Sequence, residues 1–198
     1  VLGVRFGPKE NLFQREVGLV SASGEKKKKN LTQSGYLEVG PKWAMEGKMV
    51  IYGSTREGNK TEQGRSSSGD VFGLLFTQEA FDEFSLTREE AELAKELKEK
   101  EKENAEKDTE SEKDKKDKKK KDEAEKEEEE EKVEDLKFDW ENINDRKKQL
   151  TVHTSDLNDW LLSKEGDKLF YLTSFEEKNN LWVTDLKTKE TKLFSKIN

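Results

Sequence analysis

The sequence predicts an all-β protein made of repeated antiparallel sheets, with a charged insertion in the middle of the chain. Three observations support this prediction: short alternating apolar runs broken by turn residues, an internal repeat, and an abrupt change of composition after residue 84. We therefore divide the chain into a β-rich segment at 1–84, a helical or disordered insertion at 85–135, and a second β-rich segment at 136–198.

The charge of the chain is concentrated in the insertion. Residues 88–135 contain 23 acidic and 15 basic residues, which leaves 22 acidic and 23 basic residues elsewhere. The remainder is thus nearly neutral and long enough for one domain-sized core. The chain has no cysteine, which excludes disulfides and thiolate chemistry. No stretch approaches the ~18 apolar residues of a membrane-spanning helix, so we expect no membrane insertion.

The individual elements follow from turn residues and apolar spacing. The chain opens at Val1 inside an alternating apolar run, as is typical of an internal segment of a longer protein. Strands are predicted at 1–6, 17–22, 48–52 and 70–76 in the first segment, and at 146–153, 168–173, 180–186 and 191–194 in the second.

Helices are expected only near the insertion. A short helix is predicted at 77–84, and a second begins at Thr87, which has the spacing of a capping box with Glu90. Beyond Lys100 the residues are almost all Lys, Glu and Asp. Glu–Lys pairs contribute only ~0.2–0.5 kcal/mol each. We therefore expect a frayed, solvated helix or a disordered tether there.

The two β-rich segments repeat each other in a constant register. Leu31-Thr32 matches Leu150-Thr151, Glu46-Gly47 matches Glu165-Gly166, and Tyr52 matches Tyr171, each at an offset of 119 residues. Each copy contains a strand, a glycine turn, a strand, a loop, a strand, a turn and a strand. Four strands in this order make one blade of a β-propeller, so we predict a partial propeller of four-stranded antiparallel blades.

The residues around the two glycine turns resemble those of a known family. The run from Pro41 to Lys48, followed by Ile51-Tyr52, and the run from Leu162 to Leu169, followed by Leu181–Leu186, resemble the blade signature of TolB-like and tricorn-type propellers. The order of Gly69–Phe76, a Lys/Glu-rich insertion and Phe138–Ile143 is similar to that in large tricorn-type serine peptidases of Bacteroidetes-like bacteria. Trp160 and Phe175 depart from the pattern.

The resemblance implies that this segment belongs to a peptidase but does not itself contain the catalytic residues. In that family the propellers precede a PDZ domain and a tail-specific-protease-like domain that holds the catalytic residues. No stretch of the chain matches the catalytic motifs. The expected role is therefore a non-catalytic propeller segment that gates or guides peptide or unfolded protein substrates and supports assembly. Its expected partners are the remaining blades and catalytic domain of a periplasmic or otherwise extracytoplasmic homo-oligomer.

Two rival interpretations remain open. One is a TolB-like propeller module that recruits a protein partner rather than supplying a protease with substrate. The other is an enzyme built on the propeller, such as a glycosidase or a prolyl-oligopeptidase-like protein. The second rival would need converging carboxylates or an attached hydrolase domain, and the sequence shows neither clearly.

No catalytic, cofactor-binding or metal-binding residue is predicted. His153, the single histidine, is expected to be a structural residue within a strand, because a zinc site would need further nitrogen or sulfur ligands. A group of oxygen-bearing residues could suggest a calcium site, but it does not fit the pattern of a calcium-binding loop. Ile143 stands at the fifth position of that loop, where a ligand is required, and the turn glycine is missing. This group consists of Asp139, Glu141, Asn142, Asn144 and Asp145.

Three further motifs are also assigned no chemistry. Ser66–Gly69 lacks the nucleophile-elbow pattern and is predicted to be a flexible loop at the propeller rim, which could touch a peptide if it faces the propeller mouth. Lys115–Lys121 is surrounded by acidic residues that phosphate would repel, so no nucleic acid partner is expected. The triplets beginning at Asn30 and Asn59 fit the glycosylation pattern but have no role in a bacterial protein.

Overall fold

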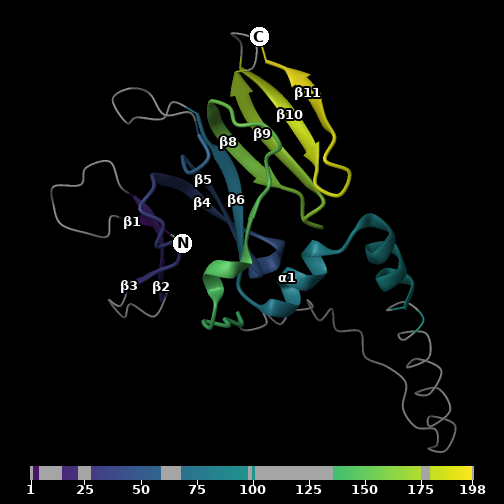
Figure 1. Cartoon of the computed structure of the whole chain (residues 1–198). Helices are drawn as coiled ribbons and strands as arrows, with labels where there is room; N and C mark the ends of the chain where they lie inside the picture. The colour runs from purple at the N-terminus through teal and green to yellow at the C-terminus, as the bar shows by residue number, and fades with distance from the viewer. Residues whose placement is uncertain are drawn as a thin grey trace, which may run out of the picture. The chain divides into compact units, whose positions relative to one another are not determined.

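The computed structural model of the chain describes residues 2–4, 15–21, 28–58, 68–97, 100, 136–174 and 179–197. The chain divides into two compact units. The larger unit combines Val1–Ser85 with Leu136–Asn198, and the smaller one covers Leu86–Asp135. The described strands all lie in the larger unit (Figure 1).

The larger unit contains three antiparallel sheets. The first has the order β1-β2-β3, with β1 (Leu2–Val4), β2 (Glu16–Val20) and β3 (Lys28–Asn30). The second has the order β4-β5-β6-β7, with β4 (Glu38–Ala44), β5 (Met49–Ser54), β6 (Asp70–Leu75) and β7 (Lys147–Gln149). The third has the order β11-β10-β9-β8, with β8 (Leu157–Leu162), β9 (Lys168–Ser174), β10 (Asn179–Asp185) and β11 (Thr191–Lys196). The prediction of an all-β fold with antiparallel four-stranded sheets is confirmed.

The two central strands of the second sheet, β5 and β6, are buried on both faces. Every residue of β5 and β6 is buried. Because side chains alternate along a strand, Val50 and Tyr52 lie in one core with Val17 of the first sheet, whereas Ile51 lies in a second core with Leu169 of the third sheet. Figure 1 shows β4, β5 and β6 beside β8, β9 and β10. The second sheet is thus the middle layer of a stack.

The sequence repeat coincides with the strands. An offset of 119 residues places β4 on β8 and β5 on β9. It also places Leu31 on Leu150, the residues that follow the last strands of the first and second sheets. Both donate a backbone hydrogen bond to the sheet they leave, Leu31 to Val17 at 2.9 Å and Leu150 to Val71 at 2.8 Å. The repeat therefore reflects a repeated structure.

The predicted strand at 146–153 is wrong in its extent. Only β7 is extended, and Arg146 belongs to a short 3-10 helix, η2 (Ile143–Arg146). The chain leaves the sheet at Leu150 because the hydroxyl of Thr151 accepts a hydrogen bond from the Val71 backbone N–H, 3.2 Å away. The side chain replaces a backbone partner there, and the strand ends.

Two helices lie near the insertion. α1 (Gln78–Ser85) follows β6, as the sequence predicted. In the smaller unit a helix covers residues 88–97, and its capping box is formed: Thr87 N donates to Glu90 Oε2 at 2.8 Å, and Glu90 N donates to Thr87 Oγ1 at 3.3 Å. The predicted tether beyond Lys100 falls at 101–135, outside the described residues.

Candidate functional site

The second and third sheets interlock through one tryptophan. Trp160 of β8 is 6% exposed, and its ring covers Gly40 and Gly53 of the second sheet. A Cβ atom on Gly53 would lie 2.6 Å from the ring, and one on Gly40 would lie 2.7 Å from it. The two glycines therefore form a slot that only the absence of side chains leaves open.

A cation strengthens the same junction. Lys42 Nζ of β4 lies 2.5 Å from Asp159 Oδ1 and 2.8 Å from the carbonyl oxygen of Trp160. The hydrogen bond from Lys42 holds the pKa of the Asp159 carboxyl below its ordinary value. The first strands of the two sheets are thus fixed against each other at the Trp160 slot.

A pocket opens beside this slot. Its volume is about 190 Å³. It lies where the β5–β6 connection and the segment leading into β8 meet, and the backbone bridge between Gly69 and Ser155 joins these two segments. The lining is formed by Leu37, Val39, Gly53, Ser54, Thr55, Ser68, Gly69, Asp156, Leu157 and Trp160. The pocket therefore has an apolar floor, with hydroxyl groups and one carboxylate around it.

Buried polar atoms without partners gather near the pocket. Within the described part of the chain, the indole N–H of Trp160 and the hydroxyl of Ser155 have no hydrogen-bond partner. One carboxylate oxygen of Glu38 also has no partner, but side chains alternate along a strand, so Glu38 lies on the opposite face of β4 from the lining residue Val39. An unsatisfied buried polar group costs ~1–3 kcal/mol, and such groups gather where function outweighs stability.

Glu38 belongs to a buried polar cluster between the first and second sheets. Burial raises the pKa of Glu38, although the hydroxyls of Ser34 and Thr32 oppose this. Burial also lowers the pKa of Lys147, whose Nζ donates to the carbonyl oxygen of Thr32 at 2.5 Å. Burial and the charge of Glu38 keep the pKa of the Tyr52 phenol well above its ordinary value. The chain thus holds an acid and a base in the same buried region.

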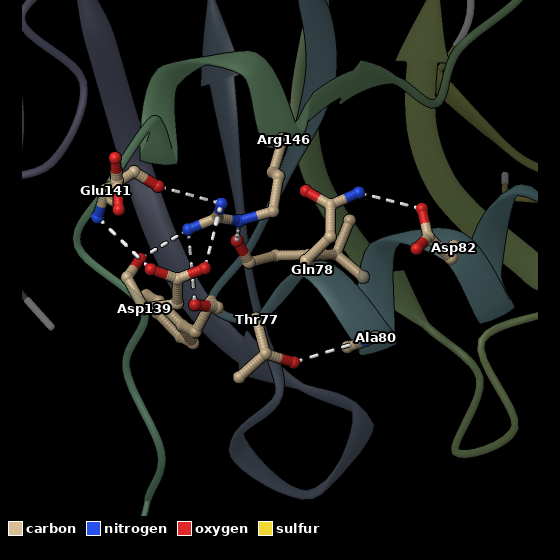
Figure 2. Close-up of polar contacts among 9 residues, drawn as sticks. Thr77, Gln78, Ala80, Asp82, Asp139, Glu141 and Arg146 are labelled. Carbon is tan, nitrogen blue, oxygen red and sulfur yellow. Dashed lines mark hydrogen bonds and ion pairs between the residues drawn. The ribbon is translucent and has the colours of Figure 1, made fainter.

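The oxygen-rich group after the insertion serves Arg146 (Figure 2). Arg146 is 2% exposed. Its guanidinium donates to the carbonyl oxygens of Leu75 at 3.4 Å and Glu141 at 2.9 Å, and also to the carbonyl of Asp139. Its Nη1 lies 3.4 Å from Asp139 Oδ2. The side chain of Asp139 and the backbone of Glu141 therefore surround a protein cation.

The remaining members of that group play no joint role. Asn142, Asn144 and Asp145 are exposed, and Asn142 adopts a left-handed conformation before η2. No set of three metal-ligating side chains is found in the described ranges. Sequence reasoning missed Arg146, because a single arginine gives no local signal that it will be buried.

The remaining residues singled out in the sequence do not form a common site. His153 was predicted within a strand, but it lies exposed in a bend, because the chain leaves the sheet at Leu150. Ser68 and Gly69 line the pocket, while Ser66 and Ser67 lie outside the described residues, as do Lys115–Lys121 and Asn59. Asn30 donates its side-chain N–H to the buried carboxylate of Glu16, a structural role.

No protein-family model and no curated protein matches the sequence. None of the helices in the described ranges is long and apolar enough to cross a membrane.

Proposed function

We propose that the chain is a non-catalytic segment of a β-propeller that binds and guides peptides, within a tricorn-like serine peptidase of the periplasm or another extracytoplasmic compartment. The observation that carries this proposal is the stack of repeated sheets, in which two loop connections meet at a pocket. Propeller blades stack in this way, and their loops commonly form binding surfaces. The remaining blades, the catalytic domain and the homo-oligomer belong to the same proposal.

The chemistry of the pocket supports binding rather than catalysis. A serine nucleophile needs an adjacent base to remove its proton. The lining provides the hydroxyls of Ser54, Thr55 and Ser68, and none of the described residues that form it is a histidine or a lysine. The single histidine, His153, is not among the lining residues. The pocket can hold a ligand, but its own side chains offer no base of the kind that activates serine.

The proposal is tested with two measurements on the chain. A fluorophosphonate probe, which labels active serine hydrolases, should leave it unlabelled. Immobilised chain should retain peptides from the tryptic digest of an unfolded protein, identified by mass spectrometry, with heat-unfolded chain as the control. Labelling by the probe, or failure to retain any peptide above the control, would refute the proposed function.

A second candidate function rests on the open face of the third sheet. Leu161 and Phe194 are 60% and 61% exposed, and Phe194 packs edge-on against Phe170 with ring centroids 5.3 Å apart. The equivalent face of the second sheet is covered by the third. A TolB-like module could use such a face to bind a folded protein. Retention of folded proteins, when the immobilised chain is offered these in place of the digest, together with no retention of peptides, would favour this alternative.

A further inference from the structure

We propose that the pocket beside Trp160 binds an aliphatic side chain of an extended peptide, at a position next to a positive charge on that peptide. This inference rests on the proposed peptide-binding function and identifies the peptide chemistry that the segment selects. The charge can be a free α-ammonium group or a neighbouring lysine or arginine side chain.

The floor of the pocket fits an aliphatic group. Leu37, Val39, Leu157 and the Trp160 ring contribute apolar surface on several sides. The volume of about 190 Å³ far exceeds the ~10–15 Å³ that one water molecule needs. An aliphatic side chain placed against these residues would remove apolar surface from water on both sides of the contact.

Two glycines in the lining allow close packing in the walls of the pocket. A Cβ atom on Gly69 would lie 2.8 Å from the carbonyl oxygen of Ser54, so the β5–β6 connection approaches itself closely there. Gly53 likewise leaves room for the Trp160 ring. The walls are also fixed, because Gly69 and Ser155 exchange two backbone hydrogen bonds, of 2.9 and 3.2 Å. The site therefore exists before a ligand arrives, which lowers the entropic cost of binding.

The charge around the pocket selects the neighbouring group. Asp156 is exposed, and among the described residues that line the pocket it is the only charged one. The nearby cation Arg56 contacts Glu57, with 3.7 Å between Nε and Oε1. A positive group on the peptide, held next to the aliphatic side chain, would lie beside the Asp156 carboxylate. The hydroxyls of Thr55 and Ser68 can pair with the peptide backbone.

The unsatisfied atoms near the pocket support a ligand site independently. The Trp160 indole belongs to a lining residue, whereas Ser155 is the sequence neighbour of the lining residue Asp156 and does not itself line the pocket. Both residues are 6% exposed. A polar atom left unpaired beside a cavity is unfavourable for folding alone, and a ligand or its ordered water relieves that cost.

Calorimetric titration of the chain with four pentapeptides tests the proposal. The first is Leu-Ser-Gly-Ser-Gly with a free amino terminus, and the second is its acetylated form. The third is acetyl-Lys-Leu-Ser-Gly-Ser, which supplies the charge from a side chain. The fourth is Ala-Ser-Gly-Ser-Gly. We expect the first and third to bind at least about tenfold more tightly than the fourth, because the leucine buries about three more methylene groups.

Three variants assign this binding to the pocket. Asp156→Asn should weaken the first and third peptides about two- to fivefold, as expected for a solvent-exposed charge pair, and should leave the second unchanged. Ser68→Phe places a ring in the pocket and should abolish binding. Asp145→Asn removes the same charge at an exposed position outside the lining and is the matched control.

The outcomes separate this inference from the proposed function. Equal affinity for the leucine and alanine peptides, or normal binding by Ser68→Phe, would overturn the pocket assignment even if digest peptides still bind. Equal affinity of the acetylated leucine peptide and both positively charged leucine peptides would overturn the charge selection. Failure of these peptides and of the digest to bind would overturn both proposals. Tighter binding of the first peptide than of the third would identify the α-ammonium as the preferred charge.

Discussion

The interlock between Trp160 and its glycine slot predicts strong coupling between two positions that are far apart in sequence. Gly53→Ala places a methyl group 2.6 Å from the Trp160 ring, and the residue has ordinary backbone angles that alanine can adopt. The substitution alone should therefore destabilise by overpacking, typically ~1–3 kcal/mol. Trp160→Ala removes a large buried side chain and should cost ~3–5 kcal/mol.

The double variant distinguishes a steric slot from two independent defects. Without the indole ring, the alanine at position 53 meets no such obstacle, and alanine is favoured over glycine within a strand by ~0.5–1 kcal/mol. Gly53→Ala should then cost nothing, or stabilise slightly, in the Trp160→Ala background. The coupling energy between the two substitutions is therefore at least ~1 kcal/mol, in the direction of mutual compensation.

Urea unfolding followed by far-ultraviolet circular dichroism measures all four proteins of this cycle. Gly73→Ala is the matched control, because its Cβ atom would meet Met49 at 2.9 Å and Leu150 at 3.5 Å rather than the indole. Its cost should be the same with and without Trp160. Additive costs for Gly53→Ala and Trp160→Ala, within ~0.5 kcal/mol, would refute the interlock.

Three further predictions concern buried polar groups, each measured by urea unfolding. Burial raises the pKa of Glu38, so the folded state holds its proton more tightly, and this stabilisation is present at acid pH and lost as pH rises through the folded pKa. The stability of Glu38→Gln relative to the parent should thus increase between pH 4 and 8; a constant difference would contradict this. Arg146→Leu leaves several carbonyl acceptors without their donor and should lower the free energy of unfolding by at least ~3 kcal/mol. Asp139→Asn changes a half-exposed carboxylate and should lower it by no more than ~1 kcal/mol. Thr32→Val and Thr151→Val should each cost ~1–3 kcal/mol, since both hydroxyls accept from a buried backbone N–H; no loss for either would contradict an equivalent role.

The strands of the sheets could be predicted because they depend on the spacing of apolar and turn residues that are close together in the sequence. β6 and β9 were found from alternating apolar residues between turns, and the capping box at Thr87 from a three-residue spacing. The constant offset between copies added long-range information, since equal registers imply equal strand positions. Whether the stacked sheets close into a propeller stays a prediction.

The candidate site could not be predicted because it depends on contacts between distant residues. The pocket joins the β5–β6 connection to the segment before β8, which lies about 100 positions later in the chain. The burial of Arg146 depends on carbonyls from Leu75 and Asp139, which lie on opposite sides of the insertion. One signal was available: Trp160 departs from the repeat, where the first copy has Pro41. A large residue at a position of small ones suggests a matching space elsewhere, and Gly40 and Gly53 supply it.

The Leu-Thr pair explains why so few identities are enough to define this repeat. The leucine donates its backbone N–H to the sheet and fills a core position, at 0% exposure for Leu31 and 1% for Leu150. The threonine that follows binds a neighbouring backbone N–H, and Thr151 also donates to the buried carboxylate of Asp70 at 2.7 Å. One dipeptide thus ends a strand, contributes to the core and satisfies buried polar groups, which few other residue pairs can do together. Positions with a single requirement, such as an apolar face, accept several residues and vary between the copies. Residues identical between the two copies are therefore found mainly at positions where one residue has several structural roles.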